Sequence, residues 1–287
     1  MPELPEVEIT ARLLDAALRG ARVESALAPG INALKTFDPP LSALTGERVE
    51  AVRRRGKQLI VDASGGLSLL MHLMSAGRLQ LYEKRAGPRD RTSRLLLRLV
   101  PASGEGELEL RLREFGSKQA AWVKLLPTAE LEQDESLARL GPEAWPEPPQ
   151  ALSALLDVPR PLHALLRDQH VVAGIGRSWV DEILWEAMLS PFKRGGDLDA
   201  EEVERLRAAI GATLARALAH YEEHVVLPIP DKLPMPLRVH RHEGEPCPRC
   251  ETTMRAVHFE DYVIAYCPHC QTEDRVLKDR RLSRLLR

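Results

Sequence analysis

The chain has 287 residues, of which 44% are hydrophobic and 29% charged, a composition typical of a globular protein with one large or two medium domains. It has no apolar run long enough to span a bilayer and no signal-peptide pattern, which predicts a cytoplasmic protein without a membrane partner. The formal net charge of -2 does not by itself indicate nucleic-acid binding, although Arg53, Arg54, Arg55 and Lys57 form a local basic cluster.

The first eight residues read MPELPEVE. We expect methionine aminopeptidase to expose Pro2, whose secondary amine is a nucleophile that can form an iminium ion with a masked aldehyde. Glu3 is adjacent to this amine and is suited to proton transfer. The alternative interpretation is that Pro5 and its neighbours only begin an amphipathic helix. Apolar residues at helical spacing predict a helix over residues 3–19, with Gly20 as its C-cap.

Short alternating runs follow between Ala21 and Leu126, separated by glycine and proline. This pattern predicts strands of an antiparallel sandwich or barrel. The clearest runs are Arg48–Arg54, Gln58–Asp62, Leu67–Leu73, Arg78–Tyr82, Arg94–Val100, Glu107–Arg113 and Ala121–Leu125. The proline-rich segment LGPEAWPEPPQ at residues 140–150 predicts a linker between domains.

Helical patterns follow the linker. Residues 151–157 and 162–168 are predicted to be short helices. Within residues 171–189, Gly174 and Gly176 interrupt the helical pattern, and Ser178 with Asp181 predicts a capping box for the next helix.

A longer helix is predicted to begin at a cap formed by Asp199 and Glu202. Its apolar residues recur every three or four positions, which predicts a core-facing stripe. The members of this stripe are Val203, Leu206, Ile210, Leu214 and Leu218. Residues 225–237 contain four prolines and are predicted to be a loop.

All four cysteines fall in two CxxC pairs, Cys247 with Cys250 and Cys267 with Cys270. Two such knuckles can close a tetrahedral site of four thiolates, so one structural Zn²⁺ is expected, with no open position for a substrate. Redox pairs or disulfides are the alternative. We expect a hairpin between Met254 and Tyr266, and we interpret His258 and His269 as surface residues rather than ligands. The last thirteen residues contain six basic side chains, which are either a solvated tail or phosphate contacts. These are Arg275, Lys278, Arg280, Arg281, Arg284 and Arg287.

Together these features resemble the formamidopyrimidine-DNA glycosylase and endonuclease VIII family. The matching motifs occur in the family's order and span essentially the whole chain. They are MPELPEVE, RRGKQLIVD around Lys57, REFG at 113–116, LGPE at 140–143, LRDQHVVAGIG at 166–176 and the final GEPCPRC…YCPHCQ.

The resemblance implies an α+β fold with DNA bound in a cleft between two halves. The implied order is an N-terminal catalytic helix and antiparallel β-sandwich (1–135), a linker (136–150), a helix–two-turn–helix DNA-binding domain (151–237), and a four-cysteine zinc-ribbon hairpin with a basic tail (238–287). A monomer is expected, acting on damaged DNA that is duplex or single-stranded and associated with the nucleoid.

The resemblance also implies a bifunctional DNA glycosylase and abasic-site lyase of base excision repair. A damaged nucleotide is flipped out of the stack, and the Pro2 amine attacks C1′ of its sugar. A Schiff base forms, and β,δ-elimination follows. Glu3 would act as acid and base on the sugar, and Lys57 would be a cation near the damaged site, the alternative being an ordinary exposed hairpin lysine. Glu6 matches an acidic residue near the family's active site, the alternative being a mainly structural role.

Further matches imply DNA contacts. Arg113 and Phe115 match the family's intercalating residues, although Phe115 is alternatively a buried sandwich residue. Met74 lies one residue before Ser75, which occupies the family's usual methionine wedge position. Gly176 ends the glycine motif.

Four further positions depart from the family pattern, and they alter its phosphate contacts. Arg177 replaces an asparagine and could reach a DNA phosphate with its charge, in a different geometry. Tyr262 replaces the arginine of the zinc hairpin and can donate one hydrogen bond to DNA or stack, but it cannot neutralise a phosphate. Glu114 replaces a basic residue and would repel the DNA backbone if it pointed there, and His163 replaces a lysine. Losing charged phosphate contacts should weaken DNA binding and its salt dependence.

These departures leave several functions open. The preferred one is an active glycosylase and lyase with a different grip or lesion. The others are a protein that is mainly an abasic-site lyase, a damaged-DNA-binding relative with weak or no base excision, and a zinc-ribbon module that binds another protein. The segment His224–Leu237 is short and proline-rich, so we do not expect it to fold over 8-oxoguanine.

Overall fold

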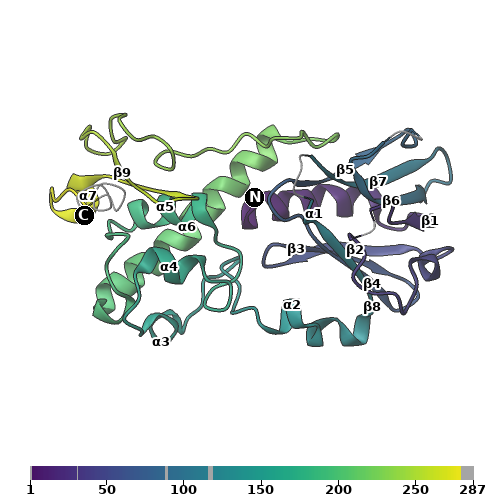
Figure 1. Cartoon of the computed structure of the whole chain (residues 1–287), viewed down its shortest axis with the longest axis horizontal. Coiled ribbons are helices and arrows are strands. Elements are labelled where there is room, and N and C mark those ends of the chain that lie inside the picture. Colours follow the sequence, from purple (N-terminus) through teal and green to yellow (C-terminus); the bar gives the residue numbers. More distant parts are fainter. Residues whose placement is uncertain (1, 31, 88–89, 116–118, 279–287) are drawn as a thin grey trace. The chain divides into compact units, whose positions relative to one another are not determined.

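A computed structural model describes residues 2–30, 32–87, 90–115 and 119–278 (Figure 1). The chain divides into two compact units, Met1–Arg139 with His220–Pro234 and Leu140–Ala219 with Met235–Arg287. The division falls inside one continuous helix, α6 (Ala200–His224), whose last turn belongs to the first unit. The expected domain boundaries remain predictions, and the basic residues from Arg280 onward lie outside the described residues.

The first unit contains helix α1 (Leu4–Leu18) and two four-stranded antiparallel sheets, which confirms the expected sandwich. One sheet has the order β1 (Arg22–Leu27), β6 (Ser93–Val100), β7 (Leu108–Glu114) and β5 (Gly77–Tyr82). The other has the order β2 (Val49–Arg55), β3 (Gln58–Ala63), β4 (Leu67–His72) and β8 (Trp122–Pro127). All seven predicted runs are strands, and β1 is an additional strand that the sequence pattern did not single out.

The core of this unit joins α1 to both sheets. Val7, Leu14 and Leu18 are fully buried from solvent, as the helical spacing predicted, and they pack in one apolar cluster with residues of both sheets. The helix ends before Gly20, whose φ of +80° is a left-handed conformation that glycine adopts without strain.

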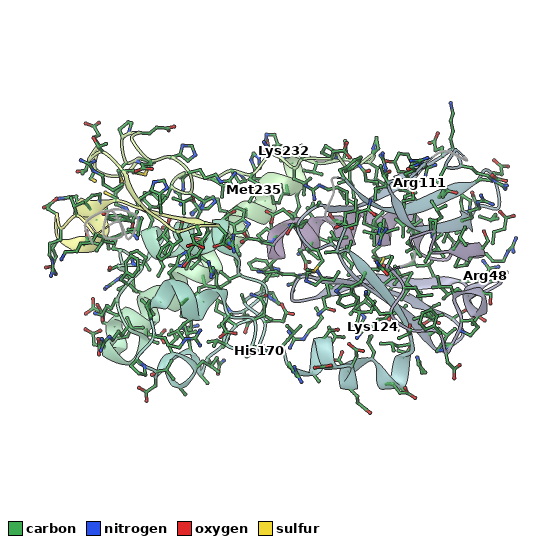
Figure 2. The ribbon with its side chains drawn as sticks, in the orientation of Figure 1. Arg48, Arg111, Lys124, His170, Lys232 and Met235 are labelled. Carbon is green, nitrogen blue, oxygen red and sulfur yellow. The ribbon has the colours of Figure 1, made fainter. Side chains whose placement is uncertain are left out.

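Three short helices complete the first unit: η1 (Leu41–Leu44), η2 (Thr128–Gln133) and α2 (Glu135–Ala138). Asp134 caps α2 by accepting from the Ser136 N–H. Lys124 on β8, labelled in Figure 2, pairs with the same carboxylate at 2.7 Å. This pair attaches the end of the sandwich to the start of α2.

The second unit begins with α3 (Leu152–Leu156) and α4 (Leu162–Arg167), followed by α5 (Arg177–Glu186), η3 (Gly195–Asp197) and most of α6. The capping box predicted at Ser178 and Asp181 is wrong, because the N-cap of α5 is Gly176 and Asp181 is only 1% exposed. The box at Asp199 and Glu202 is confirmed by reciprocal backbone-to-carboxylate bonds of 2.8 and 3.1 Å.

The chain after the proline-rich loop forms the expected hairpin, β9 (Arg255–His258) and β10 (Val263–Tyr266), followed by the short helix α7 (Pro268–Thr272). Within the described residues, no helix is both long and apolar enough to cross a membrane.

Candidate active site and metal centre

The start of α1 is a capping box formed by two glutamates. The N–H of Glu3, the N-cap residue, donates to Glu6 Oε2 at 2.8 Å, and the Glu3 side chain accepts in return from the Glu6 backbone. Glu3 is 3% exposed and Glu6 is 5% exposed, whereas Pro2 immediately before them is partly exposed. Pro2 therefore lies directly before an N-cap residue whose backbone N–H and side-chain carboxylate are both hydrogen-bonded to Glu6.

Tyr221, in the last turn of α6, completes this turn from the other side. Its hydroxyl donates to Glu6 Oε1 at 2.6 Å, and its side chain is fully buried. Burial, followed by the nearby charge of Glu6, raises the pKa of Tyr221 above its usual range. The phenol therefore keeps its proton and remains a donor at neutral pH.

Lys57 follows the left-handed Gly56 (φ 55°) at the turn between β2 and β3. It is 7% exposed, so the alternative of an exposed hairpin lysine is wrong. Burial, and then the charge of Lys57, lower the pKa of His72 to about 4. His72 is therefore neutral at physiological pH, and its Nδ1 accepts from the Met74 N–H at 2.9 Å. Met74 itself has a left-handed backbone, with φ of 50°.

Phe115 directly follows β7 and is 39% exposed, so the alternative of a buried sandwich residue is wrong. The guanidinium of Arg113 lies 4.6 Å from the centre of the Phe115 ring. Arg113 donates to the Tyr82 hydroxyl at 2.8 Å and to Thr92 Oγ1 at 3.1 Å. These two bonds fix the arginine beside the aromatic ring.

Glu114 points into the protein, so the expected repulsion of a DNA backbone does not arise. Its side chain is 1% exposed and accepts from the backbone N–H of Ala120 at 2.8 Å and of Ala121 at 3.0 Å. Arg94 lies 3.8 Å from the same carboxylate. Glu114 therefore holds residues 120–121, just before β8, against the end of β7.

In the second unit, Arg177 begins α5 and is exposed. Its guanidinium donates to the carbonyl oxygen of Asp261 at 2.8 Å and to a carboxylate oxygen of the same residue at 2.7 Å. The carboxylate of Asp261, in the same chain, therefore pairs with the guanidinium that was expected to reach a DNA phosphate.

Tyr262, next to Asp261, lies at the centre of an aromatic and cationic cluster. Its ring stacks on Phe259 with centroids 4.4 Å apart, and it lies parallel to His163 at 6.0 Å. The guanidinium of Arg167 is 4.5 Å from the Tyr262 ring, and that of Arg177 is 5.1 Å from it. Sequence reasoning missed Arg167, although it lies one helical turn after His163 on α4.

Asp181 joins α5 to the hairpin. Its Oδ2 accepts from the Ala265 N–H at 3.0 Å and lies 2.7 Å from Nδ1 of His240. The Nε2 atom of His163 is 3.3 Å from the other carboxylate oxygen. All three side chains are at most 6% exposed, and neither Asp181 nor His240 was identified from the sequence as part of a site.

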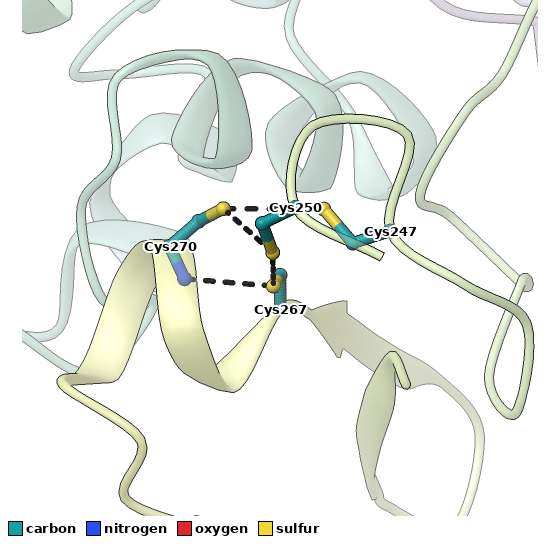
Figure 3. A group of neighbouring side chains, drawn as sticks. All are labelled: Cys247, Cys250, Cys267 and Cys270. Carbon is teal, nitrogen blue, oxygen red and sulfur yellow. Dashed lines mark hydrogen bonds between the residues drawn. The ribbon is translucent and has the colours of Figure 1, made fainter. Parts of the chain in front are cut away.

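The four cysteines of the hairpin region converge, as Figure 3 shows, and their sulfur atoms all lie within 4.8 Å of one another. Sulfur pairs are separated by 3.5 Å for Cys250 with Cys267 or Cys270, and by 3.9 Å for Cys247 with Cys270. Four thiolates around a Zn²⁺ ion at about 2.3 Å are roughly 3.8 Å apart. The four side chains therefore fit a tetrahedral metal ion.

Trp185 on α5 supports this centre from outside, because its Nε1–H donates to Cys247 Sγ at 3.3 Å. The guanidinium groups of Arg238 and Arg249 lie 4.4 and 4.1 Å from the Trp185 ring. A donor to a ligating thiolate fixes the position of that ligand and moderates its charge.

Residues 1–117 match the family model of the formamidopyrimidine-DNA glycosylase N-terminal domain, and residues 140–226 match the model of the formamidopyrimidine-DNA glycosylase H2TH domain. The chain belongs to the formamidopyrimidine-DNA glycosylase family. The four cysteines lie beyond both matched regions, so their interpretation as a metal centre rests on their spacing and geometry.

Curated relatives of this glycosylase family align over nearly the full chain. Formamidopyrimidine-DNA glycosylase of Moorella thermoacetica is 34% identical over 90% of this chain and 94% of its own. The enzyme of that name from Desulfitobacterium hafniense is 32% identical over 94% of this chain and 100% of its own. A solved structure of Lactococcus lactis Fpg in complex with DNA containing an abasic site is 25% identical, with a TM-score of 0.82, over 94% of this chain and 99% of its own.

Proposed function

We propose that this member of the glycosylase family is a bifunctional DNA glycosylase and abasic-site lyase that repairs damaged DNA, with the Pro2 amine as its nucleophile. The observation that carries the proposal is the position of Pro2, directly before a buried carboxylate, Glu3, at the N-terminus of α1. The relatives' names support the glycosylase activity, and the DNA in the Lactococcus lactis structure supports DNA as the partner.

The first step joins the sugar to the protein. After removal of the initiator methionine, the nitrogen lone pair of Pro2 attacks C1′ of the flipped nucleotide, and the bond between C1′ and the base breaks with its electron pair leaving on the base. The attacking nitrogen loses its own proton in this step, and the departing base takes up one proton in exchange. Glu3 donates a proton to the ring oxygen of the sugar as the ring opens, which leaves an iminium ion between Pro2 and C1′.

The iminium ion is the electron sink for strand cleavage. It acidifies the hydrogens on C2′, and removal of one of them expels the 3′ phosphate by β-elimination. Loss of the C4′ hydrogen then expels the 5′ phosphate by δ-elimination, and water releases the unsaturated sugar from Pro2. Lys57, buried at the turn after β2, would supply a positive charge near the reacting nucleotide.

The DNA-contacting residues are assigned by the same proposal. Phe115 would fill the gap left by the flipped nucleotide, with Arg113 facing the unpaired base and Met74 as a second wedge. Gly176, Arg177 and Tyr262 would lie against the phosphate backbone. One Zn²⁺ held by Cys247, Cys250, Cys267 and Cys270 would stabilise the hairpin that carries Tyr262.

The loop after α6 bears on which lesion is recognised. Ile229 is 5% exposed and packs in the core of the first unit, and Gln80 donates to its carbonyl oxygen at 3.0 Å. Gln80 also donates to the carboxylate of Asp231 at 2.8 Å. These attachments to β5 support a loop that is held against its own unit rather than one that folds over 8-oxoguanine. A complex in which this segment covers that base would refute this part of the proposal.

A second candidate is an enzyme that is mainly an abasic-site lyase. It is favoured by the ion pair between Arg177 and Asp261, which competes with a phosphate contact. An abasic sugar already presents a masked aldehyde, so its cleavage requires the Pro2 amine but less binding energy for flipping a stacked base. Comparing single-turnover excision of damaged bases with abasic-site cleavage separates the two candidates.

The decisive experiment is borohydride trapping on a duplex that contains one abasic site. We expect a covalent complex with the wild-type protein and loss of that complex in Pro2→Gly. The matched control is Pro40→Gly, the same change at an exposed proline of the first unit, which should trap normally. Equal trapping by Pro2→Gly would assign the nucleophile to another amine. DNA binding without any trapping would leave a damage-binding protein.

A further inference from the structure

We propose that Tyr221 is a positioning residue for the reaction of the Pro2 amine and that it acts through Glu6. The two residues are 215 positions apart in the sequence, and the Tyr221 hydroxyl donates to Glu6 Oε1 at 2.6 Å. The inference rests on the proposed function and adds to it a residue outside the sequence motifs that indicated the site.

The hydrogen bond between Tyr221 and Glu6 lies in a buried part of the protein. Tyr221 is 0% exposed and Glu6 is 5% exposed, so the carboxylate of Glu6 depends on donors from the protein rather than on water. One oxygen accepts from the phenol and the other from the Glu3 N–H at 2.8 Å. Hydrogen bonds of this kind favour the ionised carboxylate, which only accepts.

The contact also fixes geometry. Glu6 holds the backbone N–H of Glu3, and the peptide group of which that N–H is part begins at Pro2. Tyr221 therefore orients Glu6, Glu6 orients the Glu3 peptide, and that peptide sets the direction of the nucleophilic nitrogen. A nucleophile misplaced by about 1 Å loses roughly a hundred-fold in rate, so a small change in this turn is expected to appear in the chemical step.

The adjacent residue provides a matched control. Glu222 on the same turn of α6 pairs with Arg12 of α1, and both side chains are largely exposed, at 52% and 41%. This pair attaches the same two helices, but an exposed ion pair contributes little to stability. Glu222→Gln therefore tests whether helix attachment alone matters.

The experiment compares wild type, Tyr221→Phe and Glu222→Gln in single-turnover cleavage of an abasic duplex, with DNA affinity measured separately. We expect Tyr221→Phe to lower the maximal rate roughly ten- to a hundred-fold while affinity changes by less than about two-fold. Glu222→Gln should match the wild type in both measurements.

A double-mutant cycle with Glu6→Gln tests whether Tyr221 acts through Glu6. If it does, Tyr221→Phe should have little further effect in the Glu6→Gln background, whereas a general loss of stability would add. Additive losses, or a Tyr221→Phe rate equal to that of the wild type, would overturn the inference and leave the proposed function intact. A wild-type protein that neither cleaves nor traps abasic DNA would overturn both.

Discussion

The guanidinium of Arg177 is held by Asp261 through two hydrogen bonds, one to the carbonyl oxygen at 2.8 Å and one to the carboxylate at 2.7 Å. The hydrogen bond from Arg177 lowers the pKa of Asp261 below its ordinary value of 3.8. The pair is therefore fully charged at neutral pH and weakens only as the pH falls through that lowered pKa. A DNA phosphate that uses Arg177 must displace this carboxylate.

Asp261→Asn should therefore increase DNA affinity. The variant frees one guanidinium for phosphate and removes one negative charge, so we expect affinity to rise several-fold at low salt and the log–log salt slope to steepen by about 0.9. Fluorescence anisotropy on an abasic duplex from low to high salt measures both. Glu201→Gln makes the same charge change at an exposed site of the second unit and should have little effect. An unchanged slope in Asp261→Asn would show that Arg177 does not contact DNA.

His72 predicts a pH dependence of stability. Burial, and then Lys57, lower its pKa from 6.5 to about 4 in the folded protein. The unfolded chain therefore binds the proton more readily than the folded one between these two values. Stability is fully present above about pH 6.5 and is lost as the pH falls toward about 4, by at most ~3 kcal/mol.

Urea unfolding of wild type and His72→Gln at pH 7.5, 6 and 5 measures this loss. Gln retains an acceptor for the Met74 N–H but has no proton to gain. We expect the free energy of unfolding to fall with pH more steeply in the wild type than in the variant. Parallel curves would mean that His72 is not protonated on unfolding in this range.

The sequence indicated those parts of the site that depend on local pattern. The helix at Leu4–Leu18, the seven strand runs and the four cysteines follow from periodicity and spacing, and the structure contains each of them. The prediction of a capping box at Ser178 was wrong because the Asp181 carboxylate is buried. It binds two partners far along the chain, His240 and the Ala265 N–H. The spacing of a serine and a carboxylate three residues later does not indicate whether the carboxylate has such distant partners.

The same limit applies to the contacts that orient the candidate site. Tyr221 meets Glu6 across 215 residues, and Arg167 meets Tyr262 only because the hairpin packs against α4 and α5. Glu114 has the charge of a surface residue but is 1% exposed, since two backbone N–H groups and Arg94 balance it. Such pairings come from tertiary packing, so single-sequence periodicity does not reveal them.

The metal centre predicts a spectroscopic response. Cys250→Ser removes one of the four thiolates and should unfold the hairpin, which lowers DNA affinity while the sandwich of the first unit stays folded. Because Trp185 donates to Cys247, its fluorescence should change in this variant and when a chelator removes zinc from the wild type. Trp185→Phe should lack the chelator-induced change, and Trp122→Phe, on β8, should retain it. Zinc content measured with a colorimetric dye checks the loss of metal directly, and unchanged DNA affinity in Cys250→Ser would count against a hairpin that docks on DNA.

Phe115 provides the last test, because an exposed aromatic ring held beside an arginine is suited to filling a gap in stacked bases. Phe115→Ala should lower excision from a damaged duplex roughly ten-fold, since the flipped state loses the ring that replaces the missing base. On single-stranded DNA the loss should be much smaller, because no paired stack has to be refilled. Phe37→Ala removes a ring that is 76% exposed in the same unit and should leave both rates unchanged. Equal losses on duplex and single strand would mean that Phe115 supports the local fold of the first unit rather than the flipped state.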